Sequence, residues 1–253
     1  MTLLTGNPPT GTPTWLDLGI PDLQQAAEFY GRLFGWEFQD YGAEAGHYHA
    51  CLLRGEPVAG MMENPDAGAD HWWSVYFATD DCDGTVKRVT DAGGSVVEPP
   101  MDVMDQGRMA ILKDASGAQF GLWEGRAHIG SRIVNEPGSF VWNELVAPDS
   151  GRAADFYRSV FDCTLEPIQG EMDYIVLHRP DGHGIGGVMG VPGTASPAWY
   201  TYFDVENTDE AAELVRENGG MVLAEPEDTP YGRMATVNDP FGVEFRLMKP
   251  AEM

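Results

Sequence analysis

Basic residues are scarce in this sequence of 253 residues: 15 Lys and Arg stand against 40 Asp and Glu, which gives a formal net charge of −25 at pH 7. So acidic a chain repels phosphate backbones and anionic lipid surfaces, which argues against nucleic acid and membranes as partners. The acidic residues are spread along the chain instead of forming a tail, so their simplest role is solubility.

Cysteine pairs and long apolar runs are also missing. The three cysteines, Cys51, Cys82 and Cys163, are odd in number and form no CxxC motif, which argues against a disulfide framework and favours a reducing cytoplasm. No run approaches the ~18 apolar residues of a membrane span, and the N-terminus lacks the basic start and apolar stretch of a signal peptide. The GxGxxG and GxxxxGK[ST] fingerprints of nucleotide-binding loops are absent as well, and we expect no cofactor.

What the sequence does contain is a copy of itself. "GRMAILKDASGAQFGLW" (residues 107–123) and "GRMATVNDPFGVEFRLM" (residues 232–248) agree in eight of seventeen columns. "WLDLGIPDLQQAAEFYGRLFGW" from residue 15 likewise matches "WNELVAPDSGRAADFYRSVFDC" from residue 142. The offset between the copies drifts only from 127 to 125 residues, so the chain is an internal duplication with small loop deletions.

Each copy predicts the same series of elements. A short alternating strand (15–18 or 140–145) is followed by a helix that begins after Asp22 or Asp149 as its N-cap and ends near Phe34 or Phe161. Short strands follow near 47–54, 58–62, 173–178 and 185–189, and in the first copy the pattern restarts with a strand at 72–78 and a helix at 83–92. The chain therefore holds four βαβββ units, which is an α+β architecture.

This organisation sets the expected domain boundaries. We expect a flexible lead-in over residues 1–12, a first domain over 13–127, a linker over 128–138 and a second domain over 139–253. Because the two copies can pair within one chain, a monomer is expected, with a homodimer as the alternative.

Four βαβββ units in tandem, with "EFYGRLFGW" closing a first helix and "DPFGVEFRL" leading into a last strand, resemble the vicinal oxygen chelate superfamily. This superfamily includes glyoxalase I, bleomycin-resistance proteins and extradiol dioxygenases. The resemblance covers about residues 13–125 and 139–249, and implies concave mixed sheets that take small molecules into the hollow. It implies no single function, because the fold serves metalloenzymes and metal-free binders alike.

The resemblance also implies where a metal would be held: by His or Gln on the first strand, His on the fifth and Glu on the eighth. Counting from the expected helix starts and the Asp of the last turn, these positions are Trp15, Trp73 and Gly121 in one copy and Trp142, Tyr200 and Arg246 in the other. None of these side chains is an ordinary ligand of a divalent cation. The sequence therefore predicts no metal site, unless a shifted register brings in a carboxylate such as Glu124 or Glu244.

Aromatic side chains take most of the vacated positions. Trp15, Trp73, Trp142 and Tyr200, joined by Tyr202 on the same face as Tyr200, are expected to line pockets for planar or apolar ligands.

A carboxylate follows each first-strand tryptophan by two residues and therefore shares its face: Asp17 and Glu144. Each of these carboxylates is a candidate general base if burial raises its pKa, whereas the simpler interpretation is a solvated edge carboxylate. Tyr200 is a third candidate catalytic residue. Arg246 is expected beside Tyr200 and Glu144, where it could pair with Glu144 or bind a substrate carboxylate or phenolate. Arg108 and Arg233, which both copies keep, are expected to be structural.

The leading hypothesis is a metal-independent protein that binds a hydrophobic or aromatic metabolite in secondary metabolism or drug resistance, with rearrangement of that ligand as a further activity. One alternative is a divalent-metal-dependent lyase, isomerase or dioxygenase of the same fold. The other is a regulatory or interaction protein with vestigial pockets.

Overall fold

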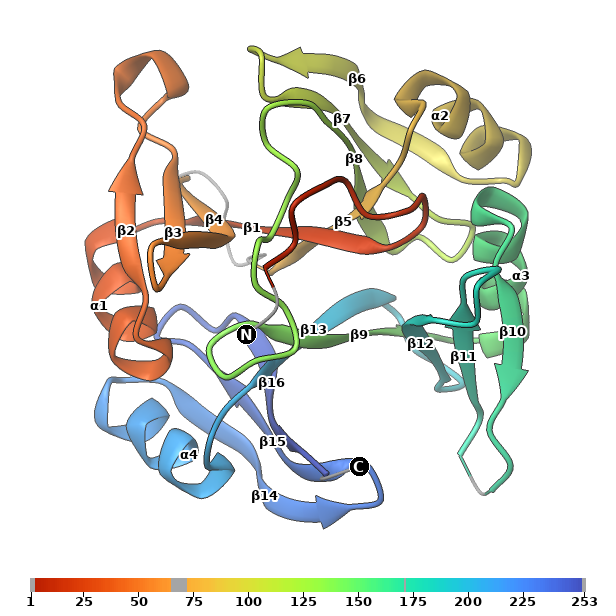
Figure 1. Cartoon of the computed structure of the whole chain (residues 1–253). Coiled ribbons are helices and arrows are strands. Elements are labelled where there is room, and N and C mark those ends of the chain that lie inside the picture. Colours follow the sequence, from red (N-terminus) through yellow and green to blue (C-terminus); the bar gives the residue numbers. More distant parts are fainter. Residues whose placement is uncertain (1–2, 65–71, 171, 252–253) are drawn as a thin grey trace.

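Each copy of the sequence repeat forms one eight-stranded mixed sheet in the computed structural model, which describes residues 3–64, 72–170 and 172–251 (Figure 1). The first sheet contains β1 (Pro13–Ile20), β2 (Glu37–Asp40), β3 (His49–Leu53), β4 (Glu56–Glu63), β5 (Ser74–Ala78), β6 (Ser95–Val103), β7 (Gly107–Lys113) and β8 (Gln119–Gly125). The second contains β9 (Phe140–Ala147), β10 (Thr164–Pro167), β11 (Tyr174–His178), β12 (Gly184–Gly190), β13 (Ala198–Asp204), β14 (Met221–Thr229), β15 (Gly232–Asn238) and β16 (Glu244–Pro250). The predicted α+β architecture of four βαβββ units in two tandem domains is confirmed.

The strand order is the same in both sheets: β2-β3-β4-β1-β5-β8-β7-β6 in the first and β10-β11-β12-β9-β13-β16-β15-β14 in the second. The first strands of the two units, β1 and β5 or β9 and β13, pair antiparallel in the middle. The last strands then pair parallel to them on either side. Figure 1 shows the outer strands of the first sheet standing on either side of this central pair, so the sheet is curved.

Four α-helices cover the convex faces of the sheets: α1 (Leu23–Phe34), α2 (Cys82–Asp91), α3 (Ser150–Phe161) and α4 (Thr208–Glu217). The predicted caps Asp22 and Asp149 accept backbone N–H groups of the first turns of α1 and α3, which satisfies donors that a helix start leaves free. Helix α1 lies against α4 of the other copy, and α2 against α3 (Figure 1). Among the described residues, none of the helices has both the length and the hydropathy that crossing a bilayer would require.

The two copies share one hydrophobic core, and two buried tyrosines cross it in reciprocal fashion. Tyr30 of α1 donates a hydrogen bond of 3.0 Å to Asp239, in the turn before β16 of the second domain. Tyr157 of α3 donates one of 2.9 Å to Asp114, in the turn before β8 of the first domain. Both tyrosines are fully buried among aromatic rings of both copies. The first helix of each domain is therefore hydrogen-bonded to a turn of the other domain.

Residues 3–12, the described part of the expected lead-in, form backbone hydrogen bonds to the linker and to the first domain. The Leu4 N–H donates to the Arg132 carbonyl, and the Gly11 N–H to the Ala78 carbonyl, each at 2.9 Å. The segment between the sheets is anchored too, because the Trp36 indole donates to the Gly138 carbonyl at 2.7 Å.

We expect Tyr30→Phe and Tyr157→Phe each to lower the free energy of unfolding by about 1–3 kcal/mol, since each substitution leaves a buried carboxylate short of one donor. Tyr231→Phe, at a ring that is 52% exposed, is the matched control and should change stability by less than about 0.5 kcal/mol. Urea titration followed by tryptophan fluorescence measures all three. Equal effects at the buried and exposed positions would contradict the role given to the reciprocal bonds.

Candidate functional site

Six side chains gather on the concave side of the second sheet, and we call this set the second concave face: Trp142, Glu144, Tyr174, Tyr200, Tyr202 and Arg246. Strand register brings five of them together, because Tyr200 lies opposite Glu144, and Tyr202 lies between Trp142 on one neighbouring strand and Arg246 on the other. Directly opposed residues point to the same face of a sheet. Of the residues proposed from the sequence, these five are brought into one site.

Tyr174 is the sixth member and comes from β11, two strands away from β9. It crosses over Gly187, where a Cβ atom would overlap its hydroxyl, and so reaches the indole of Trp142, which donates to it at 3.0 Å. The close approach of Tyr174 to β12 therefore requires a glycine at position 187, the third glycine of "GIGGVM". Sequence analysis missed Tyr174, although a tyrosine stands at the equivalent position of both copies, Tyr48 and Tyr174.

Glu144 is the buried carboxyl group of the second concave face, with 5% of its surface exposed. The Tyr202 hydroxyl donates a hydrogen bond of 3.1 Å to it. Burial raises the pKa of Glu144, while hydrogen bonds from Tyr174 and Tyr202 and the charge of Arg246 oppose that rise. The carboxyl group therefore keeps its proton to a higher pH than an exposed glutamate does.

Arg246 is the cation of the second concave face. Its Nη1 lies 2.7 Å from the Glu244 carboxylate, and its Cζ lies 4.6 Å from the centroid of the Tyr200 ring. Only 15% of the arginine side chain is exposed, so a cation–π contact here is shielded from water and stronger than at an open surface. Tyr200 and Arg246 thus form a flat wall, in which Glu244 pairs with one nitrogen of the guanidinium.

The corresponding first concave face is filled by its own side chains. Trp15 donates through its indole to Asp17 and to the Tyr48 hydroxyl, both at 2.9 Å, and Tyr48 donates to Asp17. Trp15, Tyr76 and Trp123 are each at most 7% exposed and form a cluster of their own. Burial raises the pKa of Asp17 as well, but this carboxyl group is enclosed by its neighbours.

The linker completes this filling. The His128 ring packs edge-on against Trp15 with 4.3 Å between ring centroids, and its carbonyl accepts from the Trp123 indole at 2.8 Å. Burial lowers the pKa of His128 to about 4, so the ring is neutral at pH 7 and acts as one more packing group. Trp15 and Asp17, proposed as site residues, therefore belong to a packed cluster.

Three exchanges distinguish the two faces. Gly121 stands opposite Tyr76 where Arg246 stands opposite Tyr202, and a Cβ at Gly121 would overlap the Tyr76 ring. In the other two exchanges, the first face has Ser74 where the second has Tyr200, and it has Trp123 where the second has Met248. The second face therefore has polar, partly exposed rings where the first has a closed cluster.

Trp73, expected from the sequence in the first pocket, lies on the opposite, convex face. It is 2% exposed in the shared core, where its indole donates to the Tyr30 hydroxyl at 3.2 Å. Its counterpart is Trp199, which donates to Tyr157 in the same way, rather than Tyr200. The error is one residue: α2 is capped by Asp81 and not Asp80, and a shift of one residue moves a side chain to the other face of a sheet.

Across residues 3–64, 72–170 and 172–251, no three His, Cys, Asp or Glu side chains lie close enough to hold a metal ion together. With the count on β5 corrected by one residue, the positions at which the resemblance would place ligands hold Trp15, Ser74 and Gly121 in the first sheet and Trp142, Tyr200 and Arg246 in the second. These residues do not form the donor set of imidazoles and carboxylates that divalent metals prefer.

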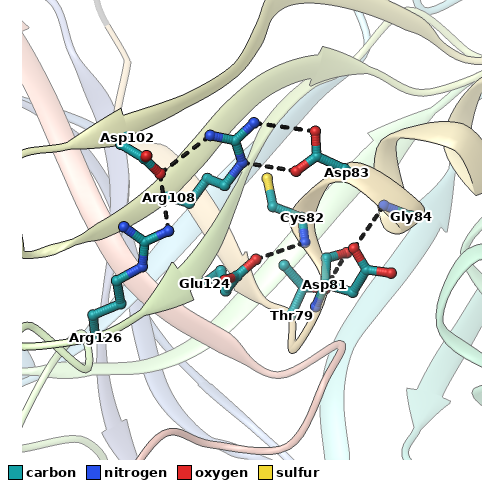
Figure 2. Close-up of polar contacts among 9 residues, drawn as sticks. All are labelled: Thr79, Asp81, Cys82, Asp83, Gly84, Asp102, Arg108, Glu124 and Arg126. Carbon is teal, nitrogen blue, oxygen red and sulfur yellow. Dashed lines mark hydrogen bonds and ion pairs between the residues drawn. The ribbon is translucent and has the colours of Figure 1, made fainter.

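Arg108 and Arg233 lie away from both concave faces, in matching ion-pair networks. Arg108 joins β7 to Asp83 at the start of α2 at 2.7 Å and to Asp102 of β6 at 3.1 Å (Figure 2). Arg233 makes the equivalent contacts with Asp209 and Asp228. Figure 2 also shows Glu124, which accepts from the Cys82 N–H at 2.9 Å instead of facing a pocket.

The sequence matches the Glyoxalase/Bleomycin resistance protein/Dioxygenase superfamily over residues 12–122 and 139–247. The chain therefore belongs to this superfamily, as the resemblance predicted.

Curated relatives match over nearly the whole length. The chain is 39% identical over 251 residues to "Putative glyoxylase CFP32" of Mycobacterium tuberculosis (strain CDC 1551 / Oshkosh), covering 95% of both chains. It is 38% identical over 264 residues to the anthracycline biosynthesis protein DnrV of Streptomyces peucetius, covering 96% of this chain and 94% of the relative. Among solved structures, a Mn(II)-bound glyoxalase from Novosphingobium aromaticivorans has a TM-score of 0.69 at 16% identity, covering 96% of this chain and 83% of that chain. At such low identity this likeness supports the fold alone.

The raised pKa of Glu144 makes a prediction with a definite sign. Because the folded-state pKa lies above the ordinary 4.5, the folded protein holds the proton more tightly than the unfolded chain. The contribution of Glu144 to stability is therefore full below pH 4.5 and falls as the pH rises through the raised value.

We expect Glu144→Gln, which cannot ionise, to gain stability relative to the natural protein across this pH range, by about 1.4 kcal/mol for each unit of pKa shift. Urea titrations at a series of pH values measure the difference, and Glu217→Gln at an exposed position is the control. A difference that stays constant with pH would contradict a raised pKa.

Proposed function

We propose that the second concave face binds a planar aromatic small molecule that carries an acidic oxygen, and that it does so without a metal ion. The observation that carries the proposal is the Arg246 guanidinium stacked on Tyr200 beside a buried carboxyl group. A flat ligand can lie along the Tyr200 and Trp142 rings, which offer apolar area at a low cost in side-chain entropy.

Arg246 supplies selectivity within this proposal. A guanidinium presents a planar array of donors that fits a carboxylate or a phenolate in a two-pronged contact. Nη1 of Arg246 is paired with Glu244 at 2.7 Å, so a ligand oxyanion would bind through the other guanidinium donors or take the place of the Glu244 carboxylate, whose side chain is 36% exposed.

Glu144 and the tyrosine hydroxyls add a route for proton transfer in the same proposal. A carboxyl group with a raised pKa keeps a proton that it can pass to a ligand at a pH at which an exposed glutamate is already ionised. Glu144 is already hydrogen-bonded to Tyr202, and Tyr200 stands on the partly exposed side of the face. A proton shift that rearranges the bound ligand is therefore the activity we assign to Glu144 and Tyr200.

The relatives support the ligand class. The Streptomyces peucetius relative is named for anthracycline biosynthesis, which brings planar, hydroxylated polycyclic aromatics of secondary metabolism into consideration here. The three buried, free cysteines suit a reducing cytoplasm. The shared core of the two copies supports a monomer, since each curved sheet already has its partner in the same chain.

Arg246→Ala should raise the Kd for alizarin, a planar dihydroxyanthraquinone, at least about tenfold, which corresponds to a loss of about 1.4 kcal/mol. Arg108→Ala removes the same charge from the network of Figure 2 and should leave the Kd unchanged within about twofold. Quenching of tryptophan fluorescence in a titration of the folded variants measures both constants. Equal effects of the two substitutions would show that the ligand binds elsewhere.

Elemental analysis tests the metal-independent part of the proposal. We expect protein purified without a histidine tag to retain no stoichiometric divalent metal after incubation with Mn, Fe, Ni or Zn and dialysis. The reason is the set of side chains at the ligand positions, Trp142, Tyr200 and Arg246, none of which is an ordinary ligand. One tightly held metal ion per chain would instead favour a metal-dependent lyase, isomerase or dioxygenase.

A further inference from the structure

A cavity of about 570 Å³ lies between the N-terminal segment and the second domain. Its walls come from residues 3–9 and 12–14, from the linker at Ser131, Val134 and Asn135, and from the starts of β9 and β12. A volume of roughly 300–1,000 Å³ is typical of small-molecule sites. The cavity is separate from the second concave face, because Trp142 is the one residue of that face among its lining residues.

The cavity exists because the two copies differ at equivalent places. In the first domain the linker crosses the starts of β1 and β4: the Ser131 N–H donates to Thr14, the Arg132 N–H to Pro57, and the Ser131 hydroxyl to the Val58 carbonyl, each at 2.7 Å. The corresponding strand starts in the second domain are lined by Val141, Trp142, Gly184 and Ile185. The cavity occupies that place instead of a packed segment.

The N-terminal segment forms the outer wall and is held there by specific contacts. Arg179, in the loop before β12, donates through Nη1 to the Thr12 hydroxyl at 2.9 Å. Leu4 is tied to the linker carbonyl of Arg132 at 2.9 Å. The wall is thus built by residues from the N-terminal segment, the linker and the second domain together.

The charge of the lining indicates what the cavity would take. Arg179 carries the one fixed charge among the described lining residues, and its guanidinium is already paired with Asp181 through Nη2 at 2.7 Å and Nε at 3.2 Å. The rest of the wall mixes apolar side chains, such as Leu4, Phe140 and Ile185, with amide and hydroxyl groups and the imidazole of His183. A charged ligand would lose its hydration here without gaining a free counter-charge.

We propose that this cavity is a second small-molecule site, which takes an uncharged and largely apolar compound. The site differs from the second concave face in position and in ligand chemistry, since Arg246 favours an acidic group there. Trp142 forms a wall of both sites.

The test is a titration of the full chain with N-phenyl-1-naphthylamine, an uncharged dye whose fluorescence rises in apolar surroundings. We expect one dye per chain, and Val141→Trp, which adds bulk at the cavity wall, should raise the Kd at least tenfold. Val134→Trp, in the linker part of the wall, provides a second blocking variant should the first fail to fold. Val97→Trp, on the exposed strand β6, is the control and should leave the Kd unchanged.

Two further measurements separate this proposal from the function proposed above. Arg246→Ala should leave the Kd for the uncharged dye unchanged. In that same variant, 8-anilinonaphthalene-1-sulfonate, which has the same aromatic skeleton plus a sulfonate, should bind at least tenfold more weakly than the uncharged dye. Equal binding of the two dyes would overturn the ligand class. Failure of the uncharged dye to bind, or binding that survives both blocking variants in folded protein, would overturn the site.

Discussion

Two buried hydroxyl-to-carboxylate hydrogen bonds, Tyr30 to Asp239 and Tyr157 to Asp114, fix how the halves of this molecule meet. One oxygen of Asp239 accepts the N–H groups of Phe241 and Val243 and so shapes the turn before β16, while the other accepts the tyrosine of the opposite copy. The two sequence motifs that carry the family resemblance, the Phe-Tyr helix and the Asp-x-x-Gly turn, are therefore the two sides of one contact. Because each copy supplies both sides, the contact forms twice, and neither sheet can bury its convex face without the other copy.

With the convex faces committed to each other, only the concave faces are free to differ between copies, and they do. Gly121 leaves room for the Tyr76 ring, which closes the first face with Trp15, Trp123 and the neutral ring of His128. The arginine at the matching place of the second sheet cannot pack in this way. It stacks on Tyr200 and keeps that side polar. Duplication thus gives one domain a closed hydrophobic cluster and the other a polar, partly exposed face.

The sequence was enough to predict the architecture because helix caps, apolar periodicity and the repeat itself are local signals, as Asp22 and Asp149 illustrate. It was also enough to bring Trp142, Glu144, Tyr200, Tyr202 and Arg246 to one face. It failed at Trp73, because choosing Asp80 over Asp81 as the cap moved the count by one residue, and one residue reverses the face of a strand. Tyr174 was missed for another reason. Its approach to Trp142 depends on the pairing of β11 with β12 and on the absence of a side chain at Gly187, and a local sequence pattern does not predict this long-range contact.

Trp142 connects the two parts of the second domain that the first domain has filled. Its indole N–H is held by Tyr174 on the concave side, while its ring also lines the cavity beneath the N-terminal segment. In the first domain the equivalent Trp15 is packed by the His128 ring of the linker. Trp142 lines the cavity at the place where Trp15 meets the linker, and the same ring forms a wall of the face that carries Glu144 and Arg246. The two domains therefore differ at this position in the packing of one tryptophan, which the linker covers at Trp15 and which borders the cavity at Trp142.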